Sequence, residues 1–151
     1  MKSEEYRQII SDAIEQEIES YDFYRYIADK VRDSTLKSIF AELADEEMQH
    51  HEVLKGYLSK DAKALKFDPS HDYRVAQTTD LPRLSTDMKP VEGLVLAIRK
   101  ELAAMQVYTQ CACGSDDTEQ QMVFQQLANM ERGHKAKLED IYTNMAFPEV
   151  W

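Results

Sequence analysis

The sequence has few of the residues that form tight turns. Only four glycines and four prolines occur in 151 residues, well below the roughly 12% of average usage. Folds made of many short strands need such residues at frequent turns, so they are disfavoured. A chain of this length also buries a substantial core without cross-links. The composition therefore predicts one domain, residues 1–151, built from long helices.

Cysteine and tryptophan are scarce as well. The two cysteines, Cys111 and Cys113, are spaced C-x-C within a predicted helix. This spacing matches neither a zinc ribbon nor the C-x-x-C pair of a redox or rubredoxin-type site. We interpret both as buried or half-buried thiols. For the single tryptophan, Trp151, an anchoring contact and an unstructured tail both stay open.

Basic residues are outnumbered by acidic ones, 18 to 28, which gives a net charge of -10. This charge repels phosphate backbones and anionic bilayers. No apolar run approaches the roughly 18 residues of a spanning helix. Glu4 and Glu5 stand where a signal peptide would be basic and then apolar. We therefore expect a soluble, cytoplasmic protein with neither nucleic acid nor membrane as partner.

Four segments repeat apolar residues at steps of three and four, which places those residues on one face of a helix. The joints near residues 32–34 and 114–117 are short, which predicts two antiparallel hairpins. The stretch of about residues 59–87 is long enough to cross the length of a bundle. The pattern predicts an all-α four-helix bundle. Its helices are expected at about residues 4–31, 35–58, 88–113 and 118–146.

Capping residues support these boundaries. Ser34 is placed to cap the second helix, and Pro90 lies in the first turn of the third. Gly114 follows the end of the third helix. Asp116 and Asp117 are candidates for the cap of the fourth.

The two hairpins are copies of each other at an offset of 84 residues. Phe40 matches Phe124 and Leu54 matches Leu138, as do other residues along the stripes. Such an internal repeat implies a pseudo-twofold axis between the hairpins.

Ionisable residues interrupt every apolar stripe near its middle. The first and third helices carry one glutamate each, and the second and fourth carry a Glu-x-x-His motif whose side chains share a helix face. Buried, unpaired carboxylates are costly or become neutral. Two such motifs plus two further glutamates form the ligand set of a carboxylate-bridged dimetal site. The predicted metal ligands are Glu17, Glu47, His50, Glu101, Glu131 and His134.

Two divalent cations would neutralise the four carboxylates of this set. The alternative is a polar layer held by internal hydrogen bonds, which four carboxylates and two imidazoles do not satisfy by themselves. Carboxylate and imidazole suit iron or manganese, whereas zinc usually prefers a tetrahedral site. We expect two iron ions, with manganese or zinc as substitutes.

Further polar residues lie near this layer. Tyr24 and Tyr108 follow the leading glutamates by two turns, and they either pack in the core or orient ligand carboxylates and donate a proton or electron. His51 shares a face with Glu47, but its repeat partner is Lys135, so a rim position is favoured over a ligand. We expect His71 at the surface. The methionines Met48, Met105, Met122 and Met130 are interpreted as core filler.

The sequence resembles the rubrerythrin-like branch of the ferritin superfamily. The resemblance lies in AIEQEIESYDFY, LADEEMQHHEVL, AIRKELAAMQVY and LANMERGHKAKL. It implies a ferritin-like bundle, a homodimer and, in full-length members, reduction of hydrogen peroxide at two irons. It also implies that Glu47 and Glu131 bridge the irons, that Glu17 and Glu101 are terminal ligands, and that His50 and His134 each bind one iron.

The sequence departs from this family at two points. Rubrerythrins carry paired C-x-x-C motifs of a rubredoxin module, which this sequence lacks, so we expect electrons from a separate donor such as a rubredoxin-like protein. The family also has a second carboxylate near the leading glutamate of the third helix. Here Ala104 stands three residues after Glu101, and its repeat partner is Ser20, which predicts a more symmetric site.

The leading hypothesis is a di-iron carboxylate oxidoreductase that reduces hydrogen peroxide or dioxygen. Two ferrous ions at bridging distance deliver two electrons together. A ferroxidase or iron-handling protein is one alternative. A non-catalytic iron-binding sensory or interaction module is another, and a monooxygenase acting on an organic substrate is a third.

Overall fold

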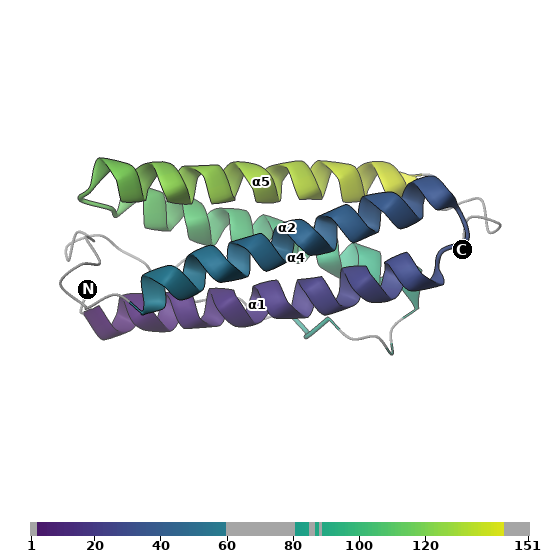
Figure 1. Ribbon diagram of the computed structural model, residues 1–151, viewed down its shortest axis with the longest axis horizontal. Coiled ribbons are helices and arrows are strands. Elements are labelled where there is room, and N and C mark those ends of the chain that lie inside the picture. The colour runs from purple at the N-terminus through teal and green to yellow at the C-terminus, as the bar shows by residue number, and fades with distance from the viewer. Residues whose placement is uncertain (1–2, 60–80, 85–86, 88, 144–151) are drawn as a thin grey trace.

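The computed structural model describes residues 3–59, 81–84, 87 and 89–143 of the chain. Within them the chain forms four α-helices that lie alongside one another (Figure 1). The prediction of an all-α four-helix bundle is confirmed. Most of the predicted crossover lies outside the described residues, as do His71, Trp151 and the predicted end of the last helix. The helices are α1 (Ser3–Lys30), α2 (Ser34–Leu58), α4 (Pro90–Cys113) and α5 (Thr118–Thr143).

The helices pair as two antiparallel hairpins. Figure 1 shows α1 and α2 joined at one end of the bundle and α4 and α5 joined at the other. Most close contacts between helices are made within these two pairs. Among the described helices, none has an apolar stretch long enough to span a bilayer.

Side-chain caps fix the starts of α2 and α5. The carboxylate of Asp33 accepts a hydrogen bond from the backbone N–H of Leu36 at 2.9 Å. The prediction of Ser34 as the cap is therefore wrong, because the preceding aspartate has the extended backbone that lets its side chain reach the third N–H. At α5, Asp117 accepts from the N–H of Gln120 at 3.0 Å.

The start of α4 has a different solution. Lys89 precedes this helix and makes no side-chain cap, and proline occupies the first turn. Proline has no N–H to satisfy, so a cap matters less there. Gly114 follows the last residue of α4 and keeps a right-handed backbone conformation.

The apolar core divides into two clusters along the bundle. One cluster includes Ile10, Leu54 and Phe124. The other includes Phe23, Phe40 and Leu138 and also takes in Leu84, from the short described piece between the hairpins. The ionisable residues that interrupt the stripes are buried near the middle of each helix. Along every helix they separate the residues of one cluster from those of the other.

Two predictions about burial are wrong. The side chains of Met122 and Met130 are 54% and 37% exposed, so they are not core filler. Cys113 is exposed, whereas Cys111 is buried, and burial raises the pKa of the Cys111 thiol to about 12. In each case the residue lies on the flank of an apolar stripe, where the packing of neighbouring helices decides exposure.

Gly93 of α4 allows close packing against Phe23 of the other hairpin. A Cβ atom at this position would overlap the ring of Phe23 from α1, whereas a Cβ at Gly133 would meet no atom within 4 Å. Phe23 is buried and belongs to the core, so it has little room to move.

We expect Gly93→Ala to lower the free energy of unfolding by about 1–3 kcal/mol, because it overpacks the core. Gly133→Ala is the matched control and should raise it by about 0.5–1 kcal/mol, because alanine restricts the unfolded chain without a clash. Urea unfolding of both variants measures the difference. Equal stability of the two variants would contradict the close packing of Gly93 on Phe23.

Candidate metal centre

Six buried side chains from all four helices converge between the hairpins. Each helix contributes its interrupting residues because they replace apolar residues on the inward face. All six are nearly inaccessible to solvent. They are Glu17 from α1, Glu47 and His50 from α2, Glu101 from α4, and Glu131 and His134 from α5.

The six residues form two overlapping groups of four. In each group, one ligand-type atom from every residue lies within 4.8 Å of the other three. Both groups contain Glu47 and Glu131. The His50 position consists of these two with Glu17 and His50, and the His134 position consists of the same two with Glu101 and His134.

The internal repeat is visible in the distances. His50 Nδ1 lies 2.7 Å from Glu131 Oε1, and His134 Nδ1 lies 2.6 Å from Glu47 Oε1. The longer approaches are also alike, at 3.7 Å from His50 Nδ1 to Glu17 and 3.8 Å from His134 Nδ1 to Glu101. The two imidazole rings stack with centroids 5.8 Å apart. A pseudo-twofold axis therefore exchanges the two positions.

Each of the two tyrosines singled out from the sequence forms a hydrogen bond to the other hairpin. Tyr24 of α1 donates a hydrogen bond to Glu101 at 2.5 Å, and Tyr108 of α4 donates one to Glu17. Both rings are buried in the apolar core. Each ring therefore packs in the core, and each hydroxyl holds a glutamate of the cluster; a role for these hydroxyls toward a bound metal stays a prediction.

His51 lies away from the cluster. Its side chain is partly exposed, and its Nδ1 is 3.3 Å from the carboxylate of its neighbour Glu52. This placement agrees with the rim position favoured by the repeat.

Burial and crowding shift the pKa values of the carboxylates in this cluster in different directions. Burial raises the pKa of Glu47 well above its ordinary value, and repulsion from Glu131 and Glu17 adds to this. Burial likewise raises the pKa of Glu101. For Glu131, burial opposes ionisation, but hydrogen bonds from Glu101 and both histidines outweigh it and lower the pKa.

The histidines act as the cations of this cluster. Burial disfavours the charged imidazolium, but hydrogen bonds to Glu131 and Glu17 raise the pKa of His50 to about 10. The close carboxylates of Glu101 and Glu131 likewise outweigh burial and raise the pKa of His134 to about 11. Both imidazoles are therefore protonated on both ring nitrogens, and so positively charged, at neutral pH when no metal cation is bound.

Several polar atoms in the cluster nevertheless have no hydrogen-bond partner among the described residues. They include one oxygen each of Glu17, Glu47 and Glu101, and Nδ1 of His134. The last lies close to carboxylates but is not aligned with them as a donor. Orphaned buried oxygens and nitrogens that converge on one space match the donors of bound metal ions. The residues present therefore fit two divalent cations.

Three buried or half-buried polar residues near the cluster were not predicted from the sequence. Glu46 hydrogen-bonds Nε2 of His134. Lys100 forms a buried ion pair with Glu19 at 2.7 Å, and Glu19 also accepts from the backbone N–H of Leu84. The repeat gave no signal for Glu46 or Glu19, because Met130 and an alanine occupy the corresponding positions.

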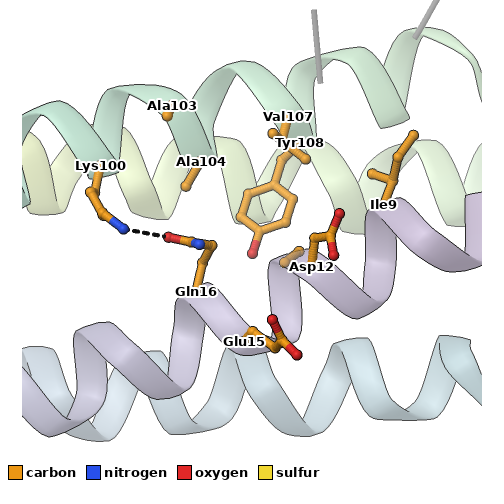
Figure 2. Close-up of a pocket in the computed structure, with 10 residues that line it drawn as sticks. Ile9, Asp12, Glu15, Gln16, Lys100, Ala103, Ala104, Val107 and Tyr108 are labelled. Atoms are coloured by element: carbon orange, nitrogen blue, oxygen red, sulfur yellow. Dashed lines mark hydrogen bonds between the residues drawn. The ribbon is translucent and has the colours of Figure 1, made fainter. Parts of the chain in front are cut away.

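A cavity of about 180 Å³ lies between α1 and α4. Tyr108 lines this cavity and also hydrogen-bonds Glu17 of the cluster. Figure 2 shows its ring reaching from α4 toward α1, with the hydrogen bond from Lys100 to Gln16 nearby. Ala103 and Ala104 line the wall on the α4 side. The small side chain at Ala104 keeps this space open.

The protonated histidines generate a pH dependence of stability. Their ordinary pKa is 6.5, so their contribution to folding is complete below that pH and is lost as the pH rises toward about 10 and 11. We expect the melting temperature of the metal-free protein to fall between about pH 7 and pH 10. Thermal unfolding with a chelator present measures this loss.

In the double variant His50→Gln/His134→Gln, the melting temperature should fall much less steeply over this alkaline range. His51→Gln is the matched control, since it removes a histidine outside the cluster, and it should keep the slope of the wild type. A double variant that falls as steeply as the wild type would contradict the protonated pair.

Solved structures share this architecture. A Thermotoga maritima protein described as a ferritin-like diiron-carboxylate protein is 21% identical, with 95% of each chain covered and a TM-score of 0.70. A hypothetical protein from Pyrococcus furiosus is 22% identical, over 96% of this chain and 92% of that chain, with a TM-score of 0.75. These similarities confirm the ferritin-like fold.

Comparison by sequence is informative at the level of the family. No curated protein matches the sequence significantly. A family model described as Rubrerythrin matches residues 8–142, which include all six residues of the cluster. The chain therefore belongs to the rubrerythrin family.

Proposed function

We propose that this protein is a di-iron carboxylate oxidoreductase that reduces hydrogen peroxide or dioxygen with electrons from a separate donor protein. The observation that carries the proposal is the pair of four-residue groups that share Glu47 and Glu131. Family membership and the structural similarity to a ferritin-like diiron-carboxylate protein support iron as the metal.

The donor set suits two irons. Glu47 and Glu131 would be shared by both metals, and each position adds one further glutamate and one histidine. Hard carboxylate oxygens with imidazole nitrogens are ligands that iron accepts readily. When bound, two ferrous ions would supply one electron each, which is what the two-electron reduction of hydrogen peroxide to water requires.

The chain's own residues hold the site in shape. The hydroxyls of Tyr24 and Tyr108 orient the carboxylates of Glu101 and Glu17, which fixes the terminal ligands on opposite sides of the cluster. Burial raises the pKa of both hydroxyls well above the ordinary value, and the negative charge of the nearby glutamates adds to this. They therefore stay protonated and remain hydrogen-bond donors across the physiological range.

The size of the cavity lined by Tyr108 favours a small molecule as the oxidant. Its volume of about 180 Å³ holds a few water-sized molecules. Its lining includes the exposed residues Asp12 and Glu15 and also Tyr108, whose hydroxyl binds Glu17. Hydrogen peroxide and dioxygen are small enough to use this space as a path to the metals.

The first test is anaerobic Fe(II) binding followed by mixing with hydrogen peroxide or with dioxygen. We expect two Fe(II) per wild-type chain. Glu47→Gln and Glu131→Gln should weaken binding at both positions by more than the roughly 10–100-fold that loss of an outer hydrogen bond costs. Equilibrium dialysis with metal analysis measures the content. Glu52→Gln, an exposed change on α2, is the matched control.

Stopped-flow absorbance then separates the possible functions. Rapid oxidation by peroxide that a reductant reverses over repeated cycles would support the oxidoreductase. Oxidation followed by release of ferric iron would support iron handling instead. Wild-type metal content in the Glu47→Gln and Glu131→Gln variants would contradict the metal centre itself.

The second test concerns the path for the oxidant. Ala104→Leu fills part of the cavity, and we expect it to slow oxidation of the ferrous protein several-fold while two Fe(II) still bind. Ala104→Ser, which introduces the residue found at the repeat position Ser20, is the matched control and should react like the wild type. An unchanged rate in Ala104→Leu would show that the oxidant enters elsewhere.

A further inference from the structure

The contacts of Nδ1, the nitrogen of each histidine that faces the cluster, follow the repeat. The contacts of Nε2, the outer nitrogen, do not. Nδ1 of each ring faces the cluster at nearly the same distance. Nε2 of His134 hydrogen-bonds the carboxylate of Glu46 from α2. Nε2 of His50 is buried and has no hydrogen-bond partner in the described part of the chain.

The repeat explains this difference. Met130 stands on α5 where Glu46 stands on α2, 84 residues earlier. A thioether is a weak acceptor, so the repeat supplies no carboxylate at the position that would match Glu46 for Nε2 of His50. Glu46 is half-buried, with its side chain 19% exposed, so its bond to His134 is shielded from water. The neighbouring Asp45 is exposed.

An outer carboxylate changes what an imidazole does as a ligand. A histidine that binds a metal through Nδ1 must carry its proton on Nε2, and an acceptor at Nε2 fixes that tautomer and the ring's orientation. A charged acceptor also makes the imidazole a stronger donor to the metal. His134 has this support from Glu46, whereas no residue in the described part of the chain gives it to His50.

We propose that Glu46 makes the two metal positions unequal, so that the His134 position binds a divalent cation first and more tightly than the His50 position. The inference rests on the proposed dimetal centre. Glu46 is a positioning residue, because it acts on the metal only through His134. The inner residues are the same in kind at both positions, so the outer hydrogen bond sets the order of filling.

Anaerobic titration with Co(II) as the probe tests this order, because visible absorption and paramagnetically shifted proton resonances report its ligands. The wild type should fill in two steps whose affinities differ by roughly 10–100-fold. The first equivalent should shift an exchange-protected N–H resonance that His134→Gln removes and His50→Gln keeps. Glu46→Ala should weaken the first step by roughly 10–100-fold and let that N–H exchange rapidly.

Three further variants sharpen the test. Glu46→Gln keeps a neutral acceptor and should give an intermediate affinity, because a charge-assisted bond is about twice as strong. Met130→Glu, at a partly exposed site, should supply the missing acceptor to His50 and tighten the second step. Asp45→Ala removes the same charge without the contact to His134 and should titrate like the wild type.

The outcomes separate the inference from the proposed function. A wild type that binds fewer than two Co(II) or Fe(II) per chain overturns the dimetal centre and the inference with it. Two ions bound with one affinity, or an unchanged first step in Glu46→Ala, overturn the inference alone. An equal loss in Asp45→Ala also overturns it, because general charge would then be the cause. Melting of each metal-free variant checks that the fold is intact.

Discussion

Four glutamates buried at one level of a helical bundle are the constraint on which the rest of this structure depends. Carboxylates removed from water must be neutralised by protons or by cations. In the metal-free chain, burial and repulsion from neighbouring carboxylates raise the pKa values of Glu47 and Glu101, and nearby carboxylates raise those of His50 and His134 to about 10 and about 11. Two divalent ions bound at this layer would serve the same purpose, and they would then stabilise the folded chain.

The duplicated hairpin makes this layer possible with few residues. Each half contributes one glutamate that both groups share, one glutamate that belongs to a single group and one histidine, and the pseudo-twofold axis brings each histidine against the shared glutamate of the other half. Neither hairpin holds a complete position alone, because Glu47 and Glu131 belong to both groups. Assembly of the two hairpins and assembly of the site are therefore one event.

The sequence predicts the shared features of this arrangement better than the differences between its halves. Helical periodicity places the six cluster residues on inward faces, and the repeat distinguishes His50 from His51, so their convergence follows from one-dimensional pattern. The role of Glu46 does not, because Asp45, Glu46 and Glu47 are consecutive acids and only the packing of α2 against the other hairpin decides which one meets Nε2 of His134. The exposure of Met130 and the choice of Asp33 over Ser34 as a cap depend on the same kind of local geometry.

The tyrosines show how a polar layer coexists with an apolar core. Tyr24 belongs to one apolar cluster and Tyr108 to the other, and each sends its hydroxyl to a glutamate of the opposite hairpin. A phenol is suited to this boundary because its ring adds buried apolar surface while its O–H satisfies an otherwise unpaired oxygen. Each tyrosine therefore ties the position of Glu17 or Glu101 to the packing of the core. A change in the packing of either cluster moves one of these glutamates, so the stability of the bundle and the shape of the site are set by the same contacts.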